Sequence, residues 1–236
     1  MNWRDQGILL GMRPLGEATA LAEVFTALHG RHVGAVRGGA SRKMAPVLQP
    51  GAQLDIAARA RLEQHMASFT VELIRARAAP LMQDRLALLA LGSVCALCRF
   101  ALPERAPYPG LYAATCAVLD TLGQPGWLRG YAQWELRLLE ETGFGLDLQQ
   151  CAVTGAKSGL AYVSPRSGRA VTAEGAGDYA ARLLPLPAAL LDGGAMGRDE
   201  LRAALGLSGH FLHTGLAHSI GKPLPAARAR LLDALG

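Results

Sequence analysis

The sequence is short of the residues that would mark several classes of protein. Only four of its 236 residues are cysteine, and only 6% are aromatic. Four irregularly spaced thiols do not make a disulfide framework, so we expect no disulfide and a reducing, cytoplasmic compartment. The N-terminus lacks the basic start, apolar run and small-residue cleavage site of an export signal. We therefore expect the mature chain to begin at or near Met1.

Long apolar runs are also missing. Each apolar stretch is cut by Arg, Glu, Gly or Pro well before the roughly 18 residues that a membrane span needs, so we expect no membrane partner. Half of the residues are nevertheless hydrophobic, which excludes a disordered or collagen-like chain. The length fits one large domain or two small ones, and we expect two.

Positive charge is concentrated in the first third of the chain. Residues 1–80 contain 10 basic and 6 acidic side chains, whereas residues 81–236 contain 14 and 13. The whole chain has a net charge of +5. This uneven distribution predicts a surface for a polyanion in the N-terminal region.

The hydrophobic pattern predicts a mixed α+β protein with domains 1–79 and 80–236. The first domain contains five short strand patterns, separated by segments with Gly or Pro, at 7–13, 17–26, 32–37, 53–61 and 68–75. Five such strands suggest a small barrel. Residues 59–64 could equally be helical, and the alanine content of 57–60 is poor for a strand.

After residue 80 the apolar residues recur at helical spacing, which predicts a mainly helical domain. A first helix ends before Pro103, and others are expected at 111–122, 128–142, 178–184, 198–206, 209–220 and 225–235. The segment of about 151–177 is rich in Gly and loses this spacing, so we expect a loop or hairpin insertion there.

The most basic turn of the chain runs from Arg37 to Lys43 and contains two adjacent glycines and a serine. Cations, backbone N–H groups and little bulk are what a DNA backbone needs from a protein surface. The alternative is a solvated basic loop without a ligand, but Arg59 and Arg61 in the same domain favour binding. The candidate DNA-binding residues are Arg13, Arg31, Arg37, Arg42 and Lys43.

The same domain has few rings on which DNA bases could stack. We expect Trp3, Phe25 and Phe69 to lie in the core and not on the surface. Proteins that bind single strands without sequence preference usually add aromatic platforms to a basic groove. Binding here should therefore be mainly electrostatic and sensitive to salt.

Signatures of catalysis are missing as well. The sequence has no GxxxxGK[ST] loop, GxSxG elbow, HExxH or GxGxxG motif, so no catalytic residue and no enzyme are expected. Acidic residues close to arginines, such as Glu135 in Glu135-Leu136-Arg137, are interpreted as solvated surface. Cys95 and Cys98 have CxxC spacing, but they lie within an apolar helix and are expected in the core.

The insertion has the layout of a zinc knuckle, with Cys151 and Thr154 as one pair and Ser164 and Ser167 as the other. A zinc site needs four soft or imidazole ligands, and only one of these positions is a thiol. We expect a metal-free hairpin, no bound zinc and no other cofactor. Three histidines, at 210, 213 and 218, spread around a helix and do not converge on an ion.

Several segments together resemble the bacterial RecO family of DNA repair and recombination proteins. They are the opening Trp3-Arg4-Asp5-Gln6-Gly7-Ile8-Leu9-Leu10, the segments 34–39 and 48–51, Trp134-Glu135-Leu136-Arg137-Leu138-Leu139-Glu140-Glu141-Thr142-Gly143, and the segments 162–170 and 183–187. The resemblance implies an N-terminal OB-fold barrel followed by a helical domain. Some members bind zinc through four cysteines; this chain keeps only Cys151 and resembles the metal-free branch.

The resemblance also implies a function without catalysis. Members bind single- and double-stranded DNA, anneal complementary strands and act with RecR, and often RecF, to exchange single-strand binding protein for RecA. This implies a nucleoid-associated location. The alternative, argued without the resemblance, is a protein-interaction adaptor without significant DNA binding.

The family's helical domain receives the acidic, Phe-ended tail of single-strand binding protein. A slot for this tail needs apolar residues and a cation, which helix 128–142 contains. The candidate cations are Arg129 and Arg137. The candidate apolar residues are Leu128, Tyr131, Leu138 and Leu139.

Overall fold

The computed structural model describes residues 2–62 and 65–236, which form two compact units. The first unit contains Met1–Gly123 and Pro225–Leu231, and the second contains Gln124–Leu224 and Leu232–Gly236. These units differ from the domains 1–79 and 80–236 of the sequence analysis, which stay a prediction.

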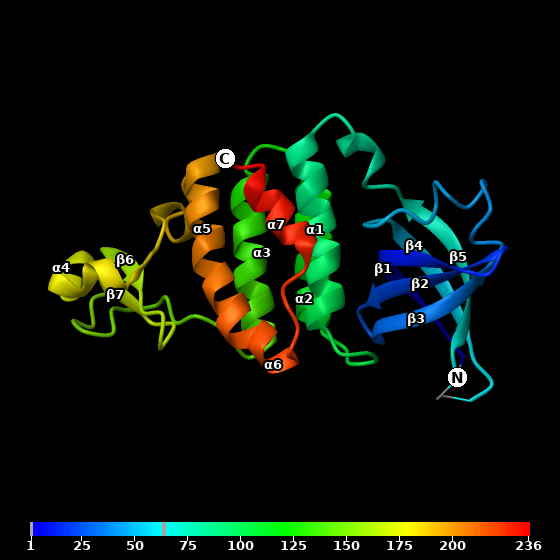
Figure 1. Ribbon diagram of the computed structural model, residues 1–236, viewed down its shortest axis with the longest axis horizontal. Helices are drawn as coiled ribbons and strands as arrows, with labels where there is room; N and C mark the ends of the chain where they lie inside the picture. Colours follow the sequence, from blue (N-terminus) through cyan, green and yellow to red (C-terminus); the bar gives the residue numbers. More distant parts are fainter. Residues whose placement is uncertain (1, 63–64) are drawn as a thin grey trace. The chain divides into compact units, whose positions relative to one another are not determined.

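The first unit contains a closed five-stranded barrel (Figure 1). Its strands are β1 (Asn2–Leu15), β2 (Thr19–Thr26), β3 (Gly30–Arg37), β4 (Gln53–Arg59) and β5 (Ala67–Arg75). They follow the order β1-β2-β3-β5-β4, and only the β3–β5 pair is parallel. This is an OB-fold, and the expected α+β class is confirmed. β4 ends at Arg59, and the last two residues of the alternative helix 59–64 lie outside the described residues.

Alternation along each strand fills the barrel. In β2 the side chains at 20, 22 and 24 are buried inside the barrel, where they meet Leu54 and Ile56 of β4 and Phe69 of β5. Adjacent residues of a strand point to opposite faces, so Leu21 and Phe25 lie on the outer face of β2, where they are buried as well. Phe25 and Phe69 are buried as expected, whereas Trp3 is only partly buried.

Helices complete the first unit. They are η1 (Ala79–Leu81), α1 (Arg85–Ala101), α2 (Pro109–Thr121) and most of α7 (Ala226–Asp233). Asp84 caps α1, because its carboxylate accepts a hydrogen bond from the amide of Ala87 at 3.0 Å. Cys95 and Cys98 are buried in α1, which confirms their core assignment, and burial raises the pKa of Cys95 to about 12.

The second unit packs α3 (Trp127–Glu141) against α5 (Arg198–Phe211). α5 continues into η4 (Leu212–Ala217) and α6 (His218–Ile220), so the helices expected at 198–206 and 209–220 are one continuous helical segment. Within the described residues, no helix is long and apolar enough to cross a membrane.

A small three-stranded sheet, ordered β7-β6-β8, belongs to the same unit. Its strands are β6 (Leu160–Val163), β7 (Ala170–Thr172) and β8 (Leu184–Pro185), with α4 (Ala173–Ala176), η2 (Gly177–Arg182) and η3 (Ala188–Leu190) beside them in the sequence. The helix expected at 178–184 is instead a 3₁₀ turn followed by a strand.

Glu135 corrects an expectation of the sequence analysis. It is fully buried on α3 and not solvated. Its carboxylate accepts hydrogen bonds from the hydroxyls of Tyr131 at 2.9 Å and Ser208 at 2.5 Å. Ser208 lies 73 residues away on α5, so the local sequence gives no sign of this partner.

Candidate nucleic-acid interface

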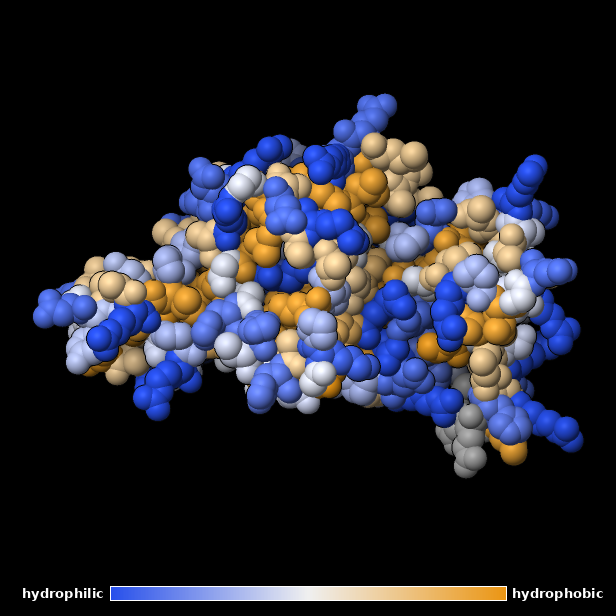
Figure 2. Space-filling view, viewed as in Figure 1, coloured by the Kyte–Doolittle hydropathy of each residue, from blue (hydrophilic) through white to orange (hydrophobic). Residues whose placement is uncertain are grey.

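Basic residues gather where the β1–β2 turn and the β3–β4 connection leave the barrel. Thr19 at the start of β2 pairs with Leu15 at the end of β1 and with Arg37 at the end of β3, so these two loops lie at the same end. The cations Arg13, Arg37, Arg42 and Lys43 are exposed here, and we call this set the basic end. Figure 2 shows hydrophilic side chains projecting from this end of the barrel.

The two glycines of the basic turn have different functions. Gly38 adopts a φ of +71°, a conformation that side chains other than glycine rarely take. At Gly39 a Cβ atom would lie 2.8 Å from the Cβ of Ala20, so only glycine fits against β2. A helical turn follows, with the amide of Leu48 bonded to the carbonyl of Met44 at 2.9 Å. The connection is thus held against the barrel while its cations face solvent.

The cations of the basic end are not neutralised. Among the described residues, none of the four forms an ion pair. Other arginines of this unit are paired: Arg4 with Asp55 at 2.5 Å, and both Arg75 and Arg77 with Asp120. Unpaired, exposed cations can neutralise phosphates and release the counterions of DNA, which makes the basic end a candidate phosphate-binding surface.

Arg31 is placed differently from the other predicted DNA-binding residues. Its side chain is 16% exposed, its Nη1 is bonded to Glu23, and its Nε donates to the carbonyl of Leu102 at 2.7 Å. Leu102 directly follows α1, so Arg31 connects β3 to the end of that helix. Its charge is already paired, and we leave it out of the proposed phosphate contacts.

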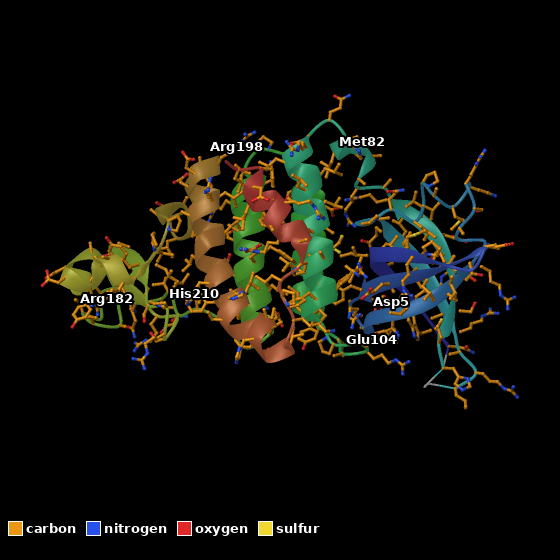
Figure 3. The ribbon with its side chains drawn as sticks, in the orientation of Figure 1. Asp5, Met82, Glu104, Arg182, Arg198 and His210 are labelled. Carbon is orange, nitrogen blue, oxygen red and sulfur yellow. The ribbon has the colours of Figure 1, made fainter. Side chains whose placement is uncertain are left out.

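A small cavity of about 150 Å³ adjoins this ion pair on the outer face of the barrel. Arg13, Arg31 and Arg99 line it together with Glu23 and Glu104, the latter labelled in Figure 3. Arg99 of α1 binds Glu23 at 2.7 Å. OB-folds commonly bind ligands on the face of β2 and β3. Here Arg99 and Glu104 reach Glu23 and Arg31 and so cover part of that face.

Arg99 also packs on the strand beneath it. A Cβ atom at Gly11 would lie 3.0 Å from Nη1 of Arg99, so glycine leaves room for the guanidinium. Glu23 and Arg99 could not be found from the sequence, because nothing in it pairs residues 76 positions apart.

Cys151 lies at the centre of the predicted metal-free hairpin. Its sulfur accepts hydrogen bonds from the amides of Val153 and Thr154, both at 3.4 Å, and of Thr172 at 3.3 Å. The side chain is buried. Desolvation raises the pKa of this thiol, but the hydrogen bonds from Thr154 and Thr172 outweigh it and lower the pKa to about 6.

The second pair of the knuckle is not the one that the sequence spacing suggested. Ser164 lies at the end of β6, in the β6–β7 turn, where its amide binds the carbonyl of Arg169 at 2.9 Å. Thr172 and Gly175 face Cys151 instead: a Cβ atom at Gly175 would lie 3.2 Å from the sulfur. The expected pairing with Ser164 and Ser167 is therefore wrong. The β6–β7 hairpin brings the residues at the end of β7 next to Cys151, and not those of the turn.

The residues that meet at this point do not fit a zinc ion. Positions 151, 154, 172 and 175 supply one thiol, two hydroxyls and no side chain, whereas structural zinc is held by four thiolate or imidazole ligands. Within the described part of the chain, no three His, Cys, Asp or Glu side chains are grouped as ligands. His210 interacts instead with the carbonyl of Pro165 at 3.1 Å.

The two arginines proposed for a partner peptide differ in their surroundings. Arg137 binds Glu140 at 2.9 Å and Glu141 at 2.6 Å on the same helix. Arg129 is partly buried beside Gly193, and its Nε has no hydrogen-bond partner among the described residues. The apolar residues proposed with them mostly fill the core: Tyr131, Leu138 and Leu139 are fully buried, and only Leu128 is partly exposed.

Comparison with known proteins identifies the family. Residues 1–77 match the family model "Recombination protein O N terminal", and residues 82–223 match "Recombination protein O C terminal". The DNA repair protein RecO of Jannaschia sp. (strain CCS1) is 60% identical over 236 residues, which cover all of this chain and 96% of that protein. The DNA repair proteins RecO of Cereibacter sphaeroides (strain ATCC 17029 / ATH 2.4.9) and Dinoroseobacter shibae (strain DSM 16493 / NCIMB 14021 / DFL 12) are 56% and 54% identical, and each match covers 100% of this chain and 98% of that protein. This chain belongs to the RecO family.

Proposed function

We propose that this chain is a recombination mediator that binds single- and double-stranded DNA through the basic end, anneals complementary strands and, with RecR, helps RecA to replace single-strand binding protein. RecF is a further partner in the same step, and no catalytic step is required of the chain. Its family membership supports a DNA repair function, because its relatives are DNA repair proteins.

One observation carries the DNA-binding part of this proposal. Arg13, Arg37, Arg42 and Lys43 are exposed at one end of an OB-fold and form no ion pair with a described residue. Such a surface contacts phosphates and not base edges, so binding should tolerate any sequence and weaken strongly with salt. Tolerance of sequence is what an annealing protein needs.

Charge reversal at the basic end tests this directly. The variant Arg42→Glu/Lys43→Glu should bind single-stranded DNA more weakly than the wild type. The slope of log affinity against log salt should also flatten by about 0.7 for each lost phosphate contact. Titration of a labelled oligonucleotide at several salt concentrations measures both quantities, and an unchanged slope would contradict the proposal.

A matched variant separates local contacts from net charge. Lys157→Glu/Arg166→Glu changes the charge by the same amount at exposed positions of the second unit. We expect it to keep the wild-type slope. Equal losses in both double variants would mean that only net charge matters. Absence of DNA binding by the wild type would favour the adaptor function instead.

The partner part of the proposal concerns the tail of single-strand binding protein. Arg129 is the better candidate for its carboxylates, because Arg137 is already bonded to two glutamates. A fluorescent tail peptide titrated against the full chain should lose affinity with Arg129→Ala and keep it with Arg137→Ala. Unchanged affinity with Arg129→Ala would place the tail elsewhere.

A further inference from the structure

An aromatic stack lies away from the basic end, where β1 begins. The indole ring of Trp3 stacks on the imidazole of His29, with ring centroids 4.4 Å apart and planes within 15°. Trp3 belongs to β1 and His29 to the β2–β3 turn, and both side chains are partly exposed. Buried rings support Trp3 from the inside: His32 at 5.3 Å and Phe69 at 5.9 Å.

Hydrogen bonds hold the turn that carries His29. The amide of His29 donates to the hydroxyl of Thr26 at 3.1 Å, and the amide of Leu28 donates to the carboxylate of Asp5 at 3.3 Å. Asp5 is labelled on the barrel in Figure 3. These contacts attach the turn to β1, so the stack is formed before any ligand arrives. A preformed surface saves the cost of ordering on binding.

The surroundings of the stack are both apolar and basic. Leu28 in the β2–β3 turn is 70% exposed, and Leu62 and Met66 in the β4–β5 connection are 56% and 55% exposed. Arg59 and Arg61 are exposed in the same region, where Arg59 lies opposite Asn2 of β1 in the sheet. Neither arginine forms an ion pair with a described residue. Contiguous exposed apolar patches mark interaction sites, and these three side chains come from the two loops at this end of the barrel.

We propose that Trp3 and His29, with Arg59 and Arg61, form a second DNA contact, which takes one unstacked base of a single strand on the open face of His29. This aromatic end rests on the proposed DNA-binding function and deepens it. Trp3 stacks on one face of the His29 ring, and the side chain is partly exposed, so the other face can receive a base. Arg59 and Arg61 then contact the flanking phosphates.

The ligand is single-stranded DNA, because only a single strand offers an unpaired base. Each base has a π face, so stacking on an aromatic ring tolerates any sequence, while cations next to the ring neutralise the backbone. β3 has eight residues, so the aromatic and basic ends are separated by roughly 25 Å, a span that several nucleotides cover. An apolar peptide would use the leucines but would gain nothing from Arg59 and Arg61.

The test uses the full chain and two oligonucleotides of equal length, one of thymidine and one of abasic sites. His29→Ala should weaken binding to the thymidine strand by roughly ten-fold, the effect of removing one stacked base, and leave binding to the abasic strand unchanged. His29→Phe keeps a ring and should keep wild-type affinity. Because stacking involves no phosphate, the salt slope should stay as in the wild type.

Other results would overturn this inference. Wild-type affinity of His29→Ala for the thymidine strand would exclude the stack, and equal losses with His29→Ala and His29→Phe would point to charge and not to a ring. Trp3→Leu is a second variant with the same expected loss, and thermal melts check that each variant is folded. If Arg42→Glu/Lys43→Glu weakens binding in the same assay while these ring variants do not, the basic end stands and the aromatic end fails.

Discussion

The barrel and the small sheet of β6, β7 and β8 are stabilised in different ways. The barrel closes on itself, and side chains of its five strands fill one apolar core that includes Leu54, Ile56 and Phe69. The small sheet has strands of four, three and two residues, which are too short to enclose a core. Its polar groups converge on the sulfur of Cys151 instead. Closure and a large apolar core stabilise the first structure, whereas the second combines a few buried apolar side chains, such as Val163 and Ala170, with hydrogen bonds to one sulfur.

The cysteines show the same difference. Burial in apolar α1 raises the pKa of Cys95 to about 12, so this thiol stays neutral. At Cys151 hydrogen bonds from Thr154 and Thr172 overcome desolvation and lower the pKa to about 6, which favours the thiolate. One residue type is therefore a small hydrophobe in one unit and an anionic hydrogen-bond acceptor in the other.

The largest effect is expected from the barrel core. Phe69→Ala removes a buried ring that packs across the barrel and should lower the free energy of unfolding by about 3–5 kcal/mol. Urea denaturation measures this loss. Phe69→Leu, which keeps most of the apolar volume, is the control and should lose much less. A loss below 1 kcal/mol for the alanine variant would mean that the barrel does not depend on this core.

A metal should be able to replace the hydrogen bonds of the small sheet. Thr154→Cys/Thr172→Cys/Gly175→Cys, combined with Cys151, places four thiols at the positions that converge. We expect this variant to bind one zinc ion and to gain about 3 kcal/mol of stability when free zinc is 100 times its Kd. Elemental analysis and melts with and without zinc measure the gain.

The spacing suggested by the sequence gives the control for this variant. Thr154→Cys/Ser164→Cys/Ser167→Cys has the same number of thiols in the arrangement that the structure does not support. It should bind zinc more weakly or not at all. Equal zinc binding by both triple variants would show that the second pair is wrongly placed.

Removal of the sulfur should loosen the small sheet alone. Cys151→Ala leaves the amides of Val153, Thr154 and Thr172 without their acceptor, so we expect these amides to exchange hydrogen roughly ten-fold faster. Amides of the barrel should exchange as before. Hydrogen-exchange mass spectrometry distinguishes the two regions, and equal acceleration in both would contradict their independent stabilisation.

The Cys151 thiolate should also make stability depend on pH. The folded pKa of Cys151 lies at about 6, below its ordinary value of 9.0. The stabilisation due to the thiolate should therefore be complete above pH 9, decrease as the pH falls from 9 to 6, and be lost below pH 6. The difference in urea midpoint between the wild type and Cys151→Ala should follow this curve. A difference that is constant over this range would exclude a stabilising thiolate.

Local pattern was enough to predict much of the fold. All five barrel strands overlap the segments predicted between the Gly and Pro breaks, although β1 extends beyond the predicted 7–13 at both ends. The core positions of Cys95 and Cys98 follow from the spacing of α1. The apolar spacing of residues 198–220 was less informative. It predicted a break between helices at 206 and 209, but the structure has one continuous helical segment there. Ser208, which lies in the predicted break, is buried, and its hydroxyl donates to the carbonyl of Ala204 within the helix.

The candidate sites depended more on distant partners. The exposed positions of Arg37, Arg42 and Lys43 followed from a local turn, and the structure leaves them exposed. The same reasoning could not place Arg31, whose partner carbonyl at Leu102 is 71 residues away. It likewise assigned Tyr131, Leu138 and Leu139 to a peptide slot, although all three fill the core of their unit.

By itself the sequence determined the strands, most helices, the excess of cations in the first third and the single thiol of the hairpin. These follow from residues next to one another, because backbone propensity and the periods of strand and helix act over a few positions. The tertiary structure decided which distant residues meet: Glu23 with Arg31 and Arg99, Cys151 with Thr172, and Trp3 with His29. Packing across the whole unit brings such pairs together, and the number of residues between two positions does not indicate whether they meet.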